Sequence, residues 1–156
     1  MRLHERRLAG IVASLILPDD SPMKRHATGT FVVNLNPLDL NEVGDGETRG
    51  RISINKTFHG DIEATSIGEM LSAMTEVKGS AGYVAMERVV GTLQGRLGSF
   101  VLQHSGTMNR GAPSLAVTVV PDSGTGELAG LTGSVNITIR EGVHCYGFDY
   151  ELADGT

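Results

Sequence analysis

The chain has 156 residues, 40% of them hydrophobic, and a formal net charge of -5. This length predicts one domain that buries a core of its own, and no apolar run reaches the roughly 20 residues that a membrane helix needs. Five of the thirteen basic residues precede residue 26, so the rest of the chain is acidic, which argues against nucleic-acid binding.

The first 25 residues differ from the rest of the chain. An apolar segment over 8–17 follows a basic start and resembles a signal peptide, but no small-x-small cleavage motif precedes 18–22. We therefore interpret residues 1–25 as a disordered N-terminal extension; a start assigned too early, with Met23 as the true start, is the alternative. The single cysteine, Cys145, cannot form an internal disulfide, which favours a cytoplasmic location.

From residue 28 onward, apolar and polar residues alternate with a period of two, which is typical of half-buried strands. Glycine-rich turns separate the alternating stretches, and no stretch predicts a helix convincingly. The predicted strands cover 31–35, 51–59, 63–74, the two arms of a long hairpin over 83–107, and then 115–120, 128–140 and 144–152. The domain is expected to span 26–152, followed by a short tail over 153–156.

Successive hairpins of this kind predict an all-β fold, an eight-stranded antiparallel up-and-down β-barrel. Closure into a barrel removes the exposed strand edges that would otherwise invite aggregation. Eight strands enclose an interior that holds either packed side chains or one small ligand. A β-sandwich is the structural alternative.

Several segments resemble a family of small bacterial proteins of unknown function. The resemblance rests on Ala27-Thr-Gly-Thr-Phe31, Phe58-His-Gly-Asp61, Gly68-Glu-Met-Leu-Ser-Ala73, Lys78-Gly-Ser-Ala-Gly-Tyr-Val84, Gln103-His-Ser-Gly-Thr-Met108 and Asp122-Ser-Gly-Thr-Gly-Glu-Leu-Ala-Gly130. It covers about residues 27–152 and implies a fold like that of allene oxide cyclase and, more distantly, of dirigent proteins. It implies a homo-oligomer but no activity, because the family has none assigned and no motif here matches the catalytic residues of the plant cyclase.

The long hairpin places two ionisable residues on its apolar face. A two-residue loop at Arg96 and Leu97 would put Glu87 opposite Gly106, diagonal to His104. The same face is the more apolar one, so it should line the barrel interior.

The neighbouring hairpins extend this inner face. A loop over 60–62 places Lys56 opposite Ser66 and Ile52 opposite Met70, and a two-residue loop at 78–79 places Met70 opposite Glu87 and Glu69 opposite Arg88. We prefer this pair of loops because they agree on which face is inside and put the opposite charges of Glu69 and Arg88 together outside. A two-residue loop at 60–61 would instead turn Glu63 and Glu69 inward. In the last hairpin, we expect Tyr146 opposite Ile137 and Phe148 opposite Val135.

The candidate site follows from these inward polar residues. His104 is the predicted proton acceptor or donor, Glu87 orients it, and Lys56 binds an anionic ligand group. Ser66, Tyr83 and Tyr146 complete the predicted ligand-binding set. The alternative is a satisfied salt-bridge network that fills a closed barrel. The scattered histidines show no metal-ligand spacing and no cofactor motif is present, so we expect neither metal nor cofactor.

Three functions are consistent with this pattern. The first is a soluble barrel that binds a small, partly apolar molecule in its lumen or mouth. The second is an isomerase or cyclase-type enzyme that uses Glu87 and His104 as acid and base. The third is a packed barrel with a structural or assembly role. Neither a nucleic acid nor a membrane is expected as a partner.

Overall fold

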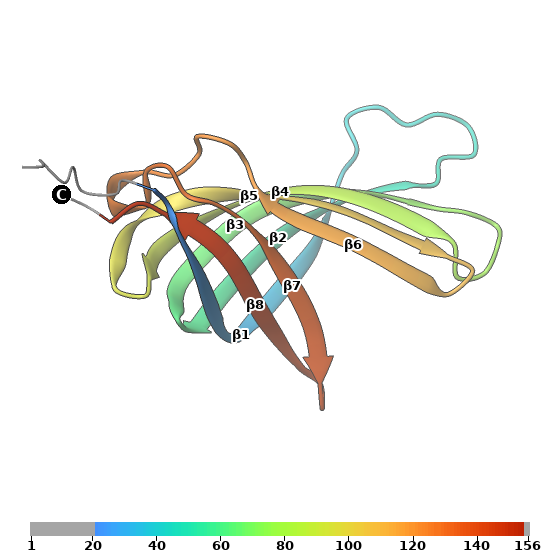
Figure 1. Cartoon of the computed structure of the whole chain (residues 1–156). Coiled ribbons are helices and arrows are strands. Elements are labelled where there is room, and N and C mark those ends of the chain that lie inside the picture. The colour runs from blue at the N-terminus through green and yellow to red at the C-terminus, as the bar shows by residue number, and fades with distance from the viewer. Residues whose placement is uncertain (1–20, 155–156) are drawn as a thin grey trace, which may run out of the picture.

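A computed structural model of the chain describes residues 21–154 and shows eight antiparallel strands that close into a barrel (Figure 1). The all-β up-and-down barrel predicted from the sequence is therefore confirmed. The elements are β1 (Met23–Leu38), β2 (Arg49–Gly60), β3 (Ile62–Met74), β4 (Ala81–Leu93), β5 (Arg96–Asn109), β6 (Ala112–Val119), the short 3-10 helix η1 (Gly126–Leu128), β7 (Thr132–Arg140) and β8 (Val143–Leu152).

The barrel is closed at one end and flared at the other. β1 pairs with β8 through its first half and with β2 through its second half, which closes the sheet. β6 and β7 pair only at Thr118 and Ser134, so these two strands part soon after they meet. In Figure 1, β6 follows β5 outward while the β7–β8 hairpin diverges below them. We call the flared region around the turns at 75–80 and 110–111 the open end.

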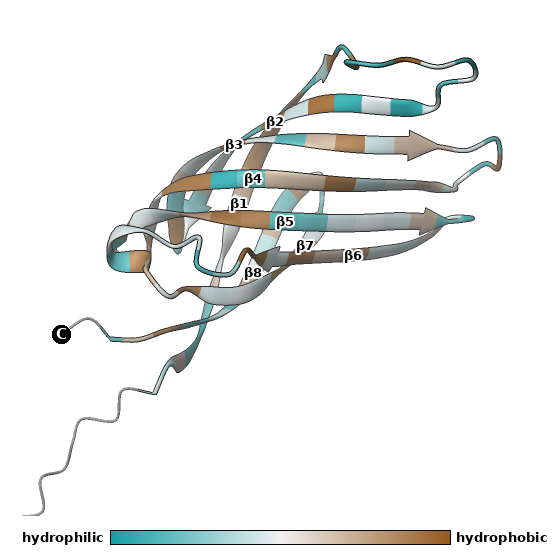
Figure 2. Cartoon of the chain, turned by 90° about the horizontal axis from the view of Figure 1, so that it is seen from above, coloured by the Kyte–Doolittle hydropathy of each residue, from teal (hydrophilic) through white to brown (hydrophobic). Residues whose placement is uncertain are grey.

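The lumen of the closed part is filled with apolar side chains. Burial alternates along the strands, and Figure 2 shows the mixture of hydrophobic and hydrophilic residues along β3, β4 and β5, which lie side by side. Every second residue of a strand points inward, so one face of each strand packs in the core. The buried core includes Phe31, Phe58, Val89, Phe100, Leu102, Val117, Tyr146 and Phe148.

Three hairpin turns share one backbone geometry. Gln94–Gly95, Arg110–Gly111 and Glu141–Gly142 all have positive φ at both positions. This is the type I′ pattern, whose twist matches that of the flanking strands, and glycine accepts positive φ without steric cost.

The predicted β4–β5 turn at Arg96 and Leu97 is therefore wrong, because the glycine that suits a positive φ lies one residue earlier. Glu87 is opposite Leu102 rather than Gly106. The shift changes the pairing by an even number of residues, so the predicted inner face survives.

The β3–β4 connection also differs from the prediction. It is a six-residue turn over 75–80, held by hydrogen bonds from Thr75 N to Ser80 O and from Ser80 N to Val77 O. Met70 therefore lies opposite Ala85 instead of Glu87.

Glu69 faces outward and pairs with Arg51 instead of Arg88. The predicted β2–β3 pairs, Lys56 with Ser66 and Ile52 with Met70, are confirmed, as is Tyr146 opposite Ile137.

Several element boundaries differ from those predicted, and the differences are largest at β1 and β7. β1 runs from Met23 to Leu38, longer at both ends than the expected 31–35. The segment before β7 is not a strand: its residues 126–128 form the 3-10 helix, and Thr125 accepts and donates hydrogen bonds at Ser99 of β5. Of the predicted N-terminal extension over 1–25, residues 1–20 lie outside the described residues, and residues 23–25 belong to β1.

Candidate functional site

Four polar side chains from four consecutive strands meet inside the barrel. Lys56 of β2, Ser66 of β3, Glu87 of β4 and His104 of β5 are 8%, 3%, 0% and 4% exposed. Glu87 is the common partner: its Oε1 accepts from Ser66 Oγ at 2.5 Å, and its Oε2 contacts Lys56 Nζ at 2.9 Å and His104 Nε2 at 2.8 Å. We call these four residues the polar cluster. The structure brings together four of the six predicted site residues.

Strand register explains why these side chains meet. Lys56 lies directly opposite Ser66 in the β2–β3 ladder, and Glu87 lies opposite Leu102 in the β4–β5 ladder. His104 is two residues from Leu102 on the same face, so it lies diagonal to Glu87, within reach of a long side chain. The cluster therefore depends on three ladders at once.

The carboxylate of Glu87 is ionised despite its burial. Burial by itself raises a carboxyl pKa, but the His104 hydrogen bond, the charge of Lys56 and the Ser66 hydrogen bond outweigh it. Together they lower the pKa of Glu87 from 4.5 to about 2. A buried charge is tolerated only when it is paired and hydrogen-bonded in this way.

Lys56 is enclosed by its neighbours. Its Nζ lies 4.7 Å from the centre of the Phe31 ring and 5.7 Å from that of Phe58, in addition to its contact with Glu87. Aromatic ring faces stabilise a cation, so two rings and one carboxylate account for this charge. The geometry favours a structural role for Lys56 over the predicted anion-binding role.

The two ring nitrogens of His104 differ in their partners. An ionised carboxylate only accepts hydrogen bonds, so Nε2 of His104 carries the hydrogen that Glu87 receives. No hydrogen bond joins Nδ1 to any residue over 21–154. The carboxylate thus fixes the orientation of the ring and leaves Nδ1 as the atom that can act on another group.

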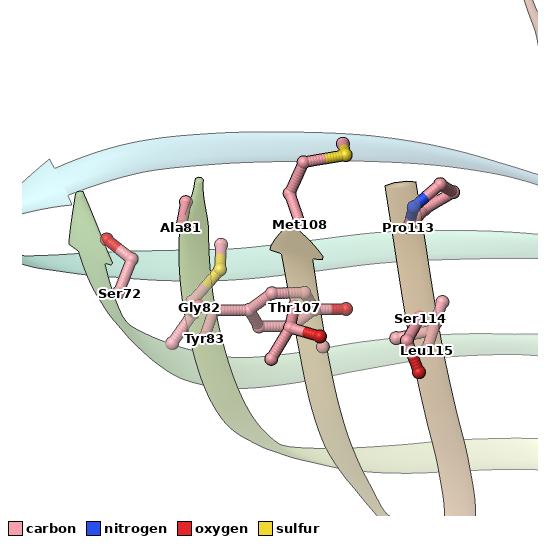
Figure 3. Close-up of a pocket in the computed structure, with 11 residues that line it drawn as sticks. Ser72, Ala81, Gly82, Tyr83, Thr107, Met108, Pro113, Ser114 and Leu115 are labelled. Atoms are coloured by element: carbon pink, nitrogen blue, oxygen red, sulfur yellow. The ribbon is translucent and has the colours of Figure 1, made fainter. Parts of the chain in front are cut away.

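Tyr83 stands between His104 and a pocket at the open end. The centres of the Tyr83 and His104 rings are 6.4 Å apart. The pocket has a volume of about 370 Å³ and is formed by β3, β4, β5 and β6 (Figure 3). Its residues are Met70, Ser72, Ala81, Gly82, Tyr83, Gly106, Thr107, Met108, Pro113, Ser114 and Leu115.

Of the predicted site residues, only Tyr83 lines this pocket. Sequence reasoning missed Met108, Pro113 and Leu115, which the prediction placed at a strand end, in a loop and at a strand start. Pro113 next to an apolar strand was a signal of an edge strand, because proline has no N–H to donate to a ladder.

Tyr146 is buried away from the polar cluster. Its hydroxyl accepts a hydrogen bond from Ile62 N at 2.9 Å and donates one to His59 O at 3.1 Å. Its ring packs edge-on against Phe58 with centres 5.8 Å apart. The Tyr146 hydroxyl therefore links β8 to β2 and β3 through hydrogen bonds, and it does not lie with the other predicted site residues.

No group of three His, Cys, Asp or Glu side chains over 21–154 is arranged to hold a metal ion. In the same range, no helix is long and apolar enough to cross a membrane.

The comparisons with known proteins agree with the fold. No curated protein matches the chain. A crystal structure of a protein of unknown function from the DUF3224 family of Shewanella oneidensis MR-1 is 51% identical, with a TM-score of 0.77; the match covers 86% of this chain and 100% of that one. Residues 27–150 match the family described as "Protein of unknown function (DUF3224)". The expected bacterial family of unknown function is thus confirmed, and the chain belongs to the DUF3224 family.

Proposed function

We propose that this protein binds a small, mostly apolar molecule in the pocket at the open end. The observation that carries the proposal is a concave, preformed site whose volume of about 370 Å³ falls within the roughly 300–1,000 Å³ of small-molecule sites. Met108 and Leu115 line it and are 40% and 45% exposed to solvent. Covering such side chains releases water from apolar surface, which is the main driving force for binding an apolar ligand.

The packing inside the closed part of the barrel favours the open end, and not the lumen, as the place where the ligand binds. Phe100 and Phe148 stack there with ring centres 5.9 Å apart, and Phe148 and Leu93 are fully buried. A densely packed interior has no room for a ligand without repacking. The flare between β6 and β7 exposes the inner strand faces to solvent at the open end.

Titration with the uncharged fluorescent dye N-phenyl-naphthylamine tests the proposal. We expect saturable binding to the wild type and at least about tenfold weaker binding to Leu115→Gln, because a polar group then faces the apolar dye. Leu97→Gln is the matched control, since Leu97 is 62% exposed and does not line the pocket. The absence of saturable binding, or equal loss in both variants, would contradict the proposal.

Acid–base catalysis is a second candidate, favoured by the Glu87–His104 hydrogen bond and the unpartnered Nδ1. Nδ1 would accept a proton from a carbon next to a carbonyl group and return it at another position, as an isomerase or cyclase-type enzyme requires. The substrate would have to reach past Tyr83. The resemblance to allene oxide cyclase that we expect from the sequence favours the same class of reaction, by analogy of fold alone.

Exchange of substrate protons in deuterated water, followed by NMR for a panel of uncharged ketones, tests this candidate. We expect His104→Gln to slow the exchange at least about hundredfold, the usual contribution of one acid–base group. If the wild type and His104→Gln exchange protons at the same rate and are equally stable, catalysis by His104 is contradicted and the polar cluster has a structural role.

The homo-oligomer stays a prediction. Multi-angle light scattering measures the mass of the assembly directly.

A further inference from the structure

Tyr83 differs from the other two tyrosines in the use of its hydroxyl. The Tyr146 hydroxyl bonds to the backbone of Ile62 and His59, and the Tyr150 hydroxyl donates to the side chain of Gln94. The Tyr83 hydroxyl makes no hydrogen bond with any residue over 21–154. Buried tyrosines usually place this group on a partner, so the partly buried Tyr83 has a polar group that is available in the pocket.

A glycine seats the Tyr83 ring in this position. Gly106 lies opposite Tyr83 in the β4–β5 ladder. A Cβ at Gly106 would overlap Cε1 of the ring and lie 3.0 Å from Cδ1, so the ring takes the place that a side chain at this position would fill. Figure 3 shows the ring reaching across β5 with its hydroxyl toward the side of Ser114 and Leu115. The hydroxyl is therefore held over the pocket by backbone packing.

The charges around the pocket favour an uncharged ligand. The residues that line the pocket include no Lys, Arg or His, so none supplies a counter-charge for an anion. The lysine of the polar cluster, Lys56, is already enclosed by Glu87 and two phenylalanine rings. Burial and then the negative charge of Glu87 raise the pKa of Tyr83, so its hydroxyl stays protonated and can donate a hydrogen bond.

We propose that the ligand is an uncharged, mostly apolar molecule with a carbonyl or ester oxygen, which accepts a hydrogen bond from the Tyr83 hydroxyl. Carboxylates of the same skeleton bind more weakly, because desolvating an anion beside Glu87 is not compensated. This inference rests on the proposed function, since it names the chemistry of the molecule that the same pocket takes. Tyr83 acts here as the residue that determines specificity.

Displacement of N-phenyl-naphthylamine by two probes with the same carbon skeleton tests the hydrogen bond. Butyrophenone carries a carbonyl group, and butylbenzene does not. We expect Tyr83→Phe to weaken butyrophenone about three- to tenfold, the effect of one neutral hydrogen bond, and to leave butylbenzene unchanged. Tyr150→Phe is the matched control, because that hydroxyl is already bonded to Gln94, and it should not alter the ratio of the two affinities.

A second comparison needs no variant and tests the charge. At pH 7 the methyl ester of phenylbutyrate should displace the dye at a concentration at least about tenfold lower than phenylbutyrate itself. Two results would overturn this inference: the acid binds as tightly as the ester or more tightly, or Tyr83→Phe does not change the affinity for butyrophenone. In either case the proposed function stands as long as the wild type still binds the dye. Failure of the dye to bind the wild type would instead remove the proposed function and this inference together.

Discussion

Gly68 lies directly opposite Glu87 across the β3–β4 ladder, and its missing side chain lets the backbones of the two strands approach closely at this point. A Cβ at this position would overlap the carbonyl oxygen of Met86 and lie 2.9 Å from Cα of Glu87. Both atoms belong to the backbone of the neighbouring strand, so they cannot move aside as a flexible side chain would.

We therefore expect Gly68→Ala to destabilise the barrel by about 1–3 kcal/mol, the usual cost of overpacking a close contact. Urea unfolding measures this difference. Gly44→Ala is the matched control, because nothing lies within 4 Å of a Cβ at Gly44, and its effect should stay within about 0.5 kcal/mol. Equal midpoints for the two variants would contradict the close contact.

Neutralising Glu87 should have a larger effect than neutralising an exposed carboxylate. Glu87→Gln leaves the buried ammonium of Lys56 without a counter-charge, which is expected to lower the free energy of unfolding by about 3–5 kcal/mol. Glu69→Gln removes an exposed ion pair with Arg51 and should lose less than about 1 kcal/mol.

Adding Lys56→Met to Glu87→Gln should recover part of the loss, since the uncompensated charge is then gone. Urea unfolding of the single and double variants forms the double-mutant cycle that isolates this coupling. Strictly additive effects of the two substitutions would argue against a direct charge interaction.

Stability should decrease at low pH because of Glu87. Its pKa is about 2 in the folded protein against an ordinary 4.5, so the folded state binds fewer protons than the unfolded state between these values. The contribution of about 3 kcal/mol is fully present above about pH 4.5 and is lost as the pH falls toward 2.

Unfolding free energies measured between pH 2 and 7 should therefore change less steeply in Glu87→Gln than in the wild type. The hydrogen bond from Arg49 lowers the pKa of Glu47 to about 2 as well, so a common slope is expected in both proteins. The difference between the two curves isolates Glu87. Parallel curves would show that the carboxylate is not held ionised by its partners.

Two hairpin turns can be improved with asparagine. Arg110 and Glu141 adopt φ of 49° and 50°, before Gly111 and Gly142. Asparagine tolerates this left-handed region better, and Asn-Gly is the preferred type I′ pair. Arg110→Asn and Glu141→Asn should each stabilise the protein by about 0.5–1 kcal/mol, which thermal unfolding detects.

The control for these turn variants is Arg140→Asn, one residue before Glu141 in the extended strand β7. Asparagine disfavours strands, so this substitution should give no gain. A comparable gain at residue 140 would show that charge removal, and not turn geometry, is responsible.

The inner face of the barrel was predictable because side-chain alternation is a local property. A strand places every second residue on one face, so Lys56, Glu87 and His104 were assigned inward from the pattern, and Ser66 from the pattern together with the preferred turn over 60–62. This assignment stayed correct although the β3–β4 and β4–β5 turns were predicted at the wrong residues. The β4–β5 pairing shifted by an even number of residues, which moves partners along the strand without exchanging the faces.

The pairing itself was not predictable, because it depends on which residues adopt positive φ. Several candidates lay close together around Gly95 and Gly98, and only the folded backbone selects Gln94–Gly95. The contacts of Glu87 were not predictable for the same reason. A shift of a few residues in strand register moves its partners beyond the reach of a hydrogen bond.

By itself, the sequence predicted an all-β fold and, with the preferred turns, placed the four members of the polar cluster on its inner face, since these features follow from a two-residue period and short turns; a sandwich and a second register for 63–74 stayed open. Only the tertiary structure decided where β6 leaves β7, and thus that Tyr83, Met108 and Leu115 surround a pocket. Only the tertiary structure shows, too, that the Tyr146 hydroxyl bonds to two backbone groups and that the Tyr83 hydroxyl has no hydrogen bond within residues 21–154. The physical reason is that these contacts join strands far apart in the chain, whose separation depends on closure of the whole sheet.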